Sequence, residues 1–330
     1  MNKTVYRIVL MTLLLVLIFI ADILLGSVTI PLSDFFEYLK GNDWSHPSYE
    51  AIIFDYRLPK ALTACFAGSA LAVSGLLMQS FFRNPLAGPY VLGISSGASL
   101  GVALLLLLFS GTFLFSVPLA ACIGSLFVLI SMIWASKRFR SSVSLLILGL
   151  MISYLTGALV GVLQYFSKSE EIQSFVLWGL GSFAKTQWTD LQMMLPVLVL
   201  GLVFAYSRSK ALNSLLLGAS YAQSLGVSIK SIRRQLLYLV GILVAWVTAY
   251  CGPIAFLGMA VPHLVRLWVE ESDHKITIPL VALTGACIAL LCEMIAQEPG
   301  YDMVLPINRI TSLLGAPFVI YYLLKKNRLG

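Results

Sequence analysis

The stretch S-R-S-K-A-L-N-S-L-L-L-G-A-S-Y-A-Q-S-L-G-V-S-I-K-S-I-R-R, residues 207–234, interrupts a chain that otherwise consists mostly of long apolar runs. It contains five Lys and Arg residues and no acid. Between these cations, the apolar positions predict two short amphipathic helices that break at Gly218 and Gly226. The stretch is therefore either a solvated linker between two hydrophobic halves or a basic platform beside a membrane.

The amino-acid composition excludes a water-soluble globular protein. The chain has 330 residues, of which 59% are hydrophobic and 11% are charged, and its mean hydropathy is +0.90. Too little polar surface remains to cover a soluble fold of this size. Because lipid cannot satisfy the hydrogen bonds of an irregular backbone, we expect an all-α polytopic membrane protein.

Apolar runs of about 20 residues predict about ten transmembrane helices. The first run is too long for the core of a signal peptide and lacks an A-x-A cleavage pattern, so we interpret it as a retained span. The predicted spans are residues 8–28, 61–81, 90–109, 115–135, 142–165, 189–206, 235–254, 255–269, 277–296 and 306–324. No stretch between them is long enough for a soluble module, so residues 1–330 form one transmembrane domain.

The distribution of charge predicts the orientation of these spans. With a cytoplasmic N-terminus, most of the 22 Lys and Arg residues fall on the inner side, and the 207–234 segment becomes the largest cytoplasmic segment. Residues 29–60 and 166–188 then lie outside, with a short helix expected around Asp34 to Leu39. Both termini are predicted to be cytoplasmic, and the net charge of +7 reflects this bias rather than binding of nucleic acid.

No motif of the sequence supports catalysis or metal binding. A phosphate-binding G-x-x-x-x-G-K-[ST] loop is missing, and His46, His263 and His274 do not have the spacing of metal ligands. The five cysteines fall within apolar runs and are interpreted as small hydrophobic residues. We expect a transport protein that is not an enzyme and holds no cofactor of its own.

Small residues recur at four-residue spacing in two spans. Gly93, Gly97 and Gly101 follow this spacing in the third span, and Gly157 and Gly161 follow it in the fifth. The spacing favours close packing between membrane helices.

Two charged residues within the later spans are candidates for an intramembrane ion pair. A charge at the centre of a span costs about 3 kcal/mol on insertion scales. Glu293 and Arg309 lie near the outer ends of consecutive spans, so we predict that they pair across the ninth and tenth helices. The alternative is that each side chain reaches the outer interface independently.

Eight motifs carry a resemblance to a known family. They are R-L-P-K-A-L at 57–62, G-S-A-L-A-V-S-G-L-L-M-Q at 68–79, R-N-P-L-A-G-P at 83–89, L-G-I-S-S-G-A-S-L-G at 92–101, G-A-S-Y-A-Q-S-L-G at 218–226, G-P-I-A-F-L-G at 252–258, V-P-H-L-V-R at 261–266 and L-L-G-A-P-F at 313–318. Together they resemble the FecCD-type permeases of ABC importers, which carry iron(III)-siderophores, haem or cobalamin.

The resemblance implies a vitamin-importer-type (type II) ABC permease fold and a set of partners. Two permease copies would form a homodimer around one path, with two cytoplasmic ATPase subunits that bind ATP and Mg²⁺ and an extracytoplasmic substrate-binding protein. The 207–234 segment would dock the ATPase, with Gly218, Ala219, Gln223, Leu225 and Gly226 at the contact. Its basic residues would lie against the anionic inner leaflet of the bacterial cytoplasmic membrane.

Further roles are implied at the two ends of the path. Arg57 and Lys60 would meet acidic residues of the binding protein, and the alternative is ordinary snorkelling to the interface. A third cation of the family pattern is replaced here by Gln297, which weakens that expectation. Ser141, Ser142 and Val143 would lie at the inner gate; the alternative is a plain basic turn.

The sequence thus predicts the permease subunit of an importer for an iron(III)-siderophore-type chelate. Cobalamin or haem is the alternative substrate. The alternative from another class is an ion-coupled secondary transporter, which would need carboxylates at the membrane centre and no ATPase.

Overall fold

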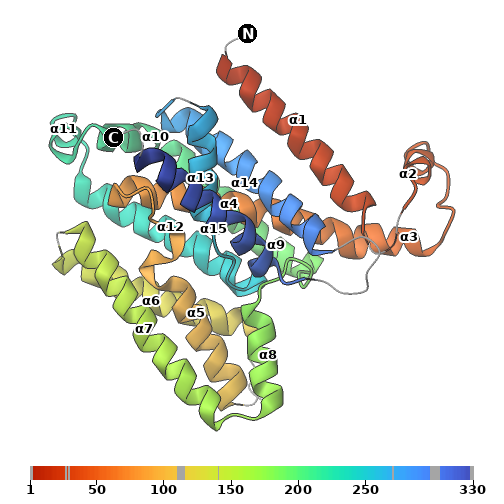
Figure 1. Ribbon diagram of the computed structural model, residues 1–330, viewed down its shortest axis with the longest axis horizontal. Coiled ribbons are helices and arrows are strands. Elements are labelled where there is room, and N and C mark those ends of the chain that lie inside the picture. Colours follow the sequence, from red (N-terminus) through yellow and green to blue (C-terminus); the bar gives the residue numbers. More distant parts are fainter. Residues whose placement is uncertain are drawn as a thin grey trace.

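The computed structural model of the chain describes residues 3–26, 28, 30–109, 116–139, 141–269, 271–297 and 305–327. Every regular element among these residues is a helix, as predicted (Figure 1). The elements are α1 (Lys3–Leu24), α2 (Leu32–Leu39), α3 (Ser48–Ala51), η1 (Ile52–Arg57), α4 (Leu58–Phe82), η2 (Pro89–Leu92), α5 (Ile94–Ala103), η3 (Leu104–Leu108), α6 (Val117–Arg138), α7 (Ser142–Phe166), α8 (Ser169–Gly179), α9 (Trp188–Ser207), α10 (Ser209–Leu216), α11 (Ala219–Ser224), α12 (Ile229–Cys251), α13 (Leu257–Trp268), α14 (His274–Ala296) and α15 (Ile307–Asn327).

The helices agree with the predicted spans. Among the described residues, seven helices are long and apolar enough to cross a membrane, and two shorter apolar helices cover Ile94–Leu108 and Ile307–Ile320. With α13, they account for the predicted set of about ten. The prediction of an all-α polytopic fold is therefore confirmed.

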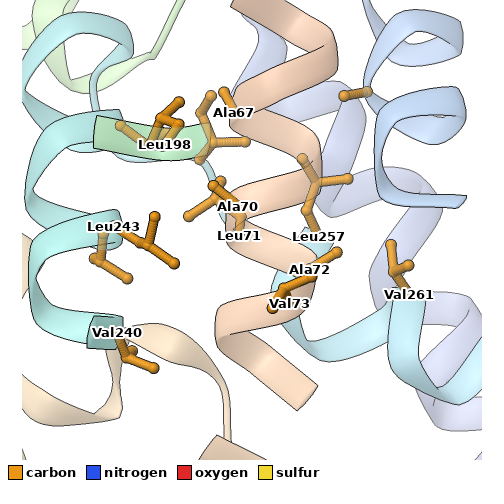
Figure 2. Packing of buried hydrophobic residues seen from close by; sticks show 14 of the residues in the cluster. Ala67, Ala70, Leu71, Ala72, Val73, Leu198, Val240, Leu243, Leu257 and Val261 are labelled. Atoms are coloured by element: carbon orange, nitrogen blue, oxygen red, sulfur yellow. The ribbon is translucent and has the colours of Figure 1, made fainter. Parts of the chain in front are cut away.

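Helix α4 forms the centre of the molecule. Its residues Ala67, Ala70 and Leu71 are fully buried, and side chains from α9, α12 and α13 surround it (Figure 2). Small residues are frequent in the middle of the helix, from Ala67 to Gly75, so its neighbours can approach closely there. The described chain is therefore organised around a buried helix.

Two glycine crossings fix the helices that pack on α4. A Cβ atom on Gly68 would lie 2.5 Å from Cβ of Ala289 and would also clash with the backbone of Gly285, on α14. Gly75 meets the backbone of Gly258, on α13, in the same way. Because only glycine allows backbones this close, α4, α13 and α14 are locked in register.

The predicted glycine packing is made in one span but not in the other. Gly97 faces the backbone of Gly124, with Cγ2 of Val128 2.6 Å from where its Cβ would be. By contrast, a Cβ on Gly157 or Gly161 would meet nothing within 4 Å. The prediction is therefore confirmed for α5 against α6, whereas the part of the chain that the structure describes places no residue against this face of α7, where the packing stays a prediction.

The connecting helices lie at opposite ends of the molecule. Figure 1 shows α2 and α3 at one end and α10 and α11 at the other. The short helix expected around Asp34 to Leu39 is α2, which spans Leu32–Leu39. The 207–234 segment is thus separated by the length of the spans from the segment that contains Arg57.

Candidate functional site

The 207–234 segment folds as the two short helices that its sequence predicts. Helix α10 ends at Leu216, α11 follows from Ala219 to Ser224, and α12 begins at Ile229. Gly218 and Gly226 take positive φ angles of 121° and 80°, which residues with a side chain rarely adopt. Glycine is therefore required at both breaks of the segment.

This segment has an inner face and an outer face. Leu212 and Ala222 are fully buried, and they pack the segment against the rest of the molecule. On the other face a ridge of large apolar side chains is exposed, and it consists of Leu216 (48% exposed), Leu217 (69%), Tyr221 (49%) and Leu225 (58%). Gln223 is also exposed. We call these four apolar residues the exposed ridge.

The cations of the segment are arranged around the ridge. Lys210, Lys230 and Arg234 are exposed. The guanidinium of Arg208 lies 4.7 Å from the ring centre of Phe204, and that of Arg233 lies 5.3 Å from the ring centre of Phe81. These cation–π contacts orient two of the basic side chains beside the ends of the spans.

A polar cavity opens next to this segment. Its volume is about 320 Å³, and its lining includes Gln79, Arg83, Leu216, Arg266, Glu271 and His274. Arg83 donates a hydrogen bond to the carbonyl of Leu215 at 3.1 Å, and Arg266 donates to Gln79. His263, nearby in sequence, is buried and donates from Nε2 to the carbonyl of Pro85 at 2.7 Å. Arg83 thus ties the loop after α4 to α10, Arg266 binds the last turn of α4, and His263 holds the loop itself.

At the other end of the molecule, the side chain of Arg57 is turned inward. Its side chain is only 5% exposed, and Nη1 donates to the carbonyls of Ile23 at 2.7 Å and Leu24 at 3.0 Å. Nη2 donates to the carbonyl of Val28. Helix α1 ends with unpaired carbonyl groups that attract a cation, so the guanidinium turns inward to them. The side chain of Arg57 is therefore engaged within the chain, and its docking to a binding protein stays a prediction.

Lys60 is also turned inward. It is 6% exposed, and its Nζ lies 3.8 Å from Oε1 of Glu293. The predicted pairing of Glu293 with Arg309 is therefore wrong, and no ion pair joins these two among the described residues. The physical reason is the crossing of α14 on α4, which brings Glu293 against Lys60, whereas Arg309 lies exposed in the first turn of α15.

Sequence analysis missed a further buried charge, that of Asp22. This residue on α1 is fully buried, and neither of its carboxylate oxygens has a hydrogen-bond partner among the described residues. Lys60 and Arg57 are the cations whose charges act on it. The signal was present in the sequence, because an acid inside the first apolar run is costly in lipid.

The structure places the remaining candidates without giving them a role. Ser141 precedes α7 in an extended conformation, Ser142 begins the helix, and Val143 is 64% exposed. Arg140, in the same turn, lies outside the described residues. The inner gate at Ser141, Ser142 and Val143 stays a prediction.

Comparison with known proteins agrees with this geometry. The chain matches the FecCD transport family over residues 13–325. It is 39% identical to the hemin transport system permease protein HmuU of Yersinia pestis, over 83% of this chain and 84% of that protein. It is 33% identical to the vitamin B12 import system permease protein BtuC of Escherichia coli, over 88% and 89% of the two chains.

Solved structures show the same fold. A metal-chelate type ABC transporter in an inward-facing conformation superposes with a TM-score of 0.86 at 32% identity, covering 96% of this chain and 98% of that one. PsaBC from Streptococcus pneumoniae in complex with Fab shares the fold alone, with a TM-score of 0.54 at 15% identity. The family match extends from α1 to α15, and on this evidence the chain belongs to the FecCD transport family.

Proposed function

We propose that this chain is the permease subunit of an ATP-binding-cassette importer that carries a bulky iron(III) chelate of the siderophore type across the bacterial cytoplasmic membrane. The relatives described above are named for hemin, vitamin B12 and metal chelates, which are all large metal complexes. The permease forms no bonds in its substrate. It provides a path whose two ends open in turn.

The observation that carries the proposal is the exposed ridge of the 207–234 segment. This segment lies between two spans and outside the apolar helices, so lipid does not cover its leucines. An exposed apolar patch rimmed by polar residues is typical of a protein interface. Two short helices with an apolar ridge fit a groove on a partner, and the surrounding cations favour the anionic inner leaflet.

The partner at this ridge is an ATPase subunit. The chain has no phosphate-binding loop of its own, so the energy of transport comes from a separate protein that binds ATP and Mg²⁺. Gly218, Ala219, Gln223, Leu225 and Gly226 lie on or beside α11, where such a subunit makes contact. Both termini are cytoplasmic in this arrangement, as the cation bias favours.

A second copy of the chain completes the path. Helix α7 exposes a long apolar face, and Gly157 and Gly161 on it have space that none of the described residues fills. Small residues at this spacing favour close helix packing in lipid, which supports a homodimer. An extracytoplasmic binding protein delivers the substrate at the end that contains α2, α3 and η1.

Reconstitution in liposomes tests the proposal. The chain is combined with its ATPase and binding protein, and uptake of a ferric hydroxamate siderophore, hemin and cyanocobalamin is measured with and without ATP. ATP-dependent uptake of an iron(III) chelate is expected. Uptake of cyanocobalamin alone would contradict the proposal of an iron(III) chelate as the substrate. Uptake without the ATPase, driven by a proton or sodium gradient, would contradict the proposal of an ATP-binding-cassette importer.

A paired variant tests the ridge itself. Gly218→Asp with Leu225→Asp places two charges on the proposed contact, so ATPase binding and uptake are expected to be lost. The matched control for ATPase binding is Gly41→Asp with Leu32→Asp, which changes an exposed glycine of positive φ and an exposed leucine at the opposite end and should leave the affinity for the ATPase unchanged. Uptake that survives the first pair would contradict docking at this segment.

Hemin is the second candidate substrate. The permease named for hemin transport is 39% identical to this chain, whereas the one named for vitamin B12 is 33% identical. Hemin is itself an iron(III) chelate, so the same uptake assay separates it from a siderophore. Saturable uptake of hemin without uptake of the siderophore would assign the chain to haem.

A further inference from the structure

The side-chain amide of Asn213, on α10, makes three hydrogen bonds to the beginning of α14. Its Nδ2 donates to Oδ1 of Asp273 at 2.6 Å. Its Oδ1 accepts from the backbone N–H of His274 at 2.8 Å and from Nδ1 of His274 at 2.8 Å. Because an ionised carboxylate can only accept, the amide nitrogen must face Asp273 and the amide oxygen must face His274. One side chain of the 207–234 segment is thus tied to two consecutive residues at the N-terminus of α14.

His274 extends this connection to α4. Its side chain is buried, and its Nε2 lies 3.0 Å from Oγ of Ser80, in the last turn of α4. Since the amide oxygen of Asn213 is an acceptor, Nδ1 of His274 carries a proton, and in the neutral ring Nε2 is an acceptor for the Ser80 hydroxyl, which also lies 3.0 Å from the carbonyl of Leu76 in its own helix. The hydrogen bonds therefore run from α10 through the first residue of α14 to α4.

Asp273 strengthens the connection by its charge. Its carboxylate caps the N-terminus of α14 by accepting from the backbone N–H of Lys275 at 2.8 Å. The hydrogen bond from Asn213 and then that from Lys275 hold the pKa of Asp273 below its usual value. The carboxylate is thus ionised at neutral pH, and hydrogen bonds to an ionised group are roughly twice as strong as neutral ones.

Helices α4 and α14 move together once α14 is displaced. Their backbones touch at Gly68 and Gly285, so neither helix can slide or tilt without the other. Near their far ends, Lys60 on α4 lies 3.8 Å from Glu293 on α14. A movement that enters at His274 is therefore delivered along both helices to the opposite side of the membrane.

We propose that Asn213 is the positioning residue that passes movement of the 207–234 segment into the α4–α14 pair. This inference rests on the proposed function, because it takes the exposed ridge as the ATPase contact. The exposed ridge and Asn213 are separate parts of the segment: Leu217 and Leu225 face outward, whereas Asn213 faces α14. Loss of the hydrogen bonds of Asn213 leaves the docking surface in place and disconnects it from α14.

The test measures coupling separately from docking. The chain is reconstituted in nanodiscs with its ATPase and binding protein, and ATP hydrolysis is measured without and with the binding protein. In Asn213→Ala, stimulation of hydrolysis by the binding protein is expected to fall about fivefold, with the Kd of the ATPase for the permease changed less than about twofold. The matched control is Ser214→Ala, a buried residue of the same helix whose hydroxyl, among the residues that the structure describes, bonds only to the carbonyl of Ala211 in α10.

A second variant covers the case in which Asn213→Ala does not fold. Ser80→Ala removes the α4 end of the connection and touches neither α10 nor the ridge, so the same loss of stimulation is expected. Unchanged stimulation in Ser80→Ala, or an equal loss in Ser214→Ala, would overturn the inference. If the wild-type permease neither binds the ATPase nor shows stimulation, the proposed function fails instead, and the two failures are distinguishable.

Discussion

The ammonium of Lys60 on α4 lies 3.8 Å from Oε1 of Glu293 on α14, and both side chains are almost fully buried. Two charges thus face each other at the contact between the central helix and the helix that packs closest to it. Removing one partner of a buried pair leaves an uncompensated charge, which costs about 3–5 kcal/mol, whereas replacing both with apolar residues is often neutral.

The first prediction concerns this pair. Glu293→Gln should lower the thermal unfolding temperature strongly, and Lys60→Met with Glu293→Leu should restore only part of the loss, because the buried Asp22 then keeps Arg57 alone as a compensating cation. Unfolding in detergent, followed by the fluorescence of buried tryptophans or by a thiol dye, measures both effects. Arg309→Ala is the control, because Arg309 is exposed; a loss as large as that of Glu293→Gln would contradict the assignment of partners.

The second prediction concerns Arg57. Its guanidinium bonds to three carbonyl groups at and after the end of α1, and a lysine can place only one ammonium there. Arg57→Lys is expected to destabilise the chain by about 1.5–3 kcal/mol, the value of one hydrogen bond to a charged group. Limited proteolysis of the α1–α2 connection should become faster in this variant. Unchanged stability together with weaker binding of the binding protein would instead support the docking role.

The third prediction compares Gly97 on α5 with Gly157 on α7, which both belong to a pattern of glycines spaced by four residues. Gly97→Ala forces a methyl group against α6 and is expected to cost about 1–3 kcal/mol of stability through overpacking. Gly157→Ala should leave the stability of the single chain unchanged, because nothing lies within 4 Å. If α7 forms the homodimer contact, Gly157→Leu with Gly161→Leu should lower the dimer fraction in native mass spectrometry. An intact dimer in that variant would place the contact elsewhere.

The fourth prediction concerns pH. The folded protein holds the pKa of Asp273 below its usual value, chiefly through the hydrogen bond from Asn213, so the unfolded chain binds the proton more tightly. The stabilisation is fully present above the unfolded pKa of about 3.9 and is lost as the pH falls through the lower folded value. The unfolding temperature of wild type should therefore drop further than that of Asp273→Asn below about pH 4. Parallel curves for the two proteins would contradict the assignment.

Hydropathy and glycine positions were sufficient to predict most of the fold. The spans follow from the length of each apolar run, and the breaks at Gly218 and Gly226 follow from the backbone angles that only glycine adopts easily. These are local properties, and each can be evaluated without knowing which helices touch. The exposed ridge was predictable for the same reason.

Partners across the fold were not predictable in this way. Glu293 and Arg309 are near in sequence, but the partner of Glu293 is Lys60, which is brought to it by the crossing at Gly68 and Gly285. Arg57 is a residue type that is usually exposed. Its burial depends on the position of the last carbonyl groups of α1, to which its guanidinium donates. Only the sequence position of Asp22, inside an apolar run, marked it in advance, and this signal was missed.

The burial of Asp22 has a consequence for biosynthesis. The ribosome delivers this carboxylate to the membrane before Arg57 and Lys60 exist, and Glu293 is made only when most of the chain has been inserted. Asp22 lies in the last turn of α1, near one end of the span, and an isolated acid in lipid is costly. We expect the end of the first helix that carries Asp22 to stay near the lipid surface until α4 arrives to neutralise it. Truncation before α4 should leave the first helix poorly inserted, and the order of synthesis thereby becomes part of how this protein assembles.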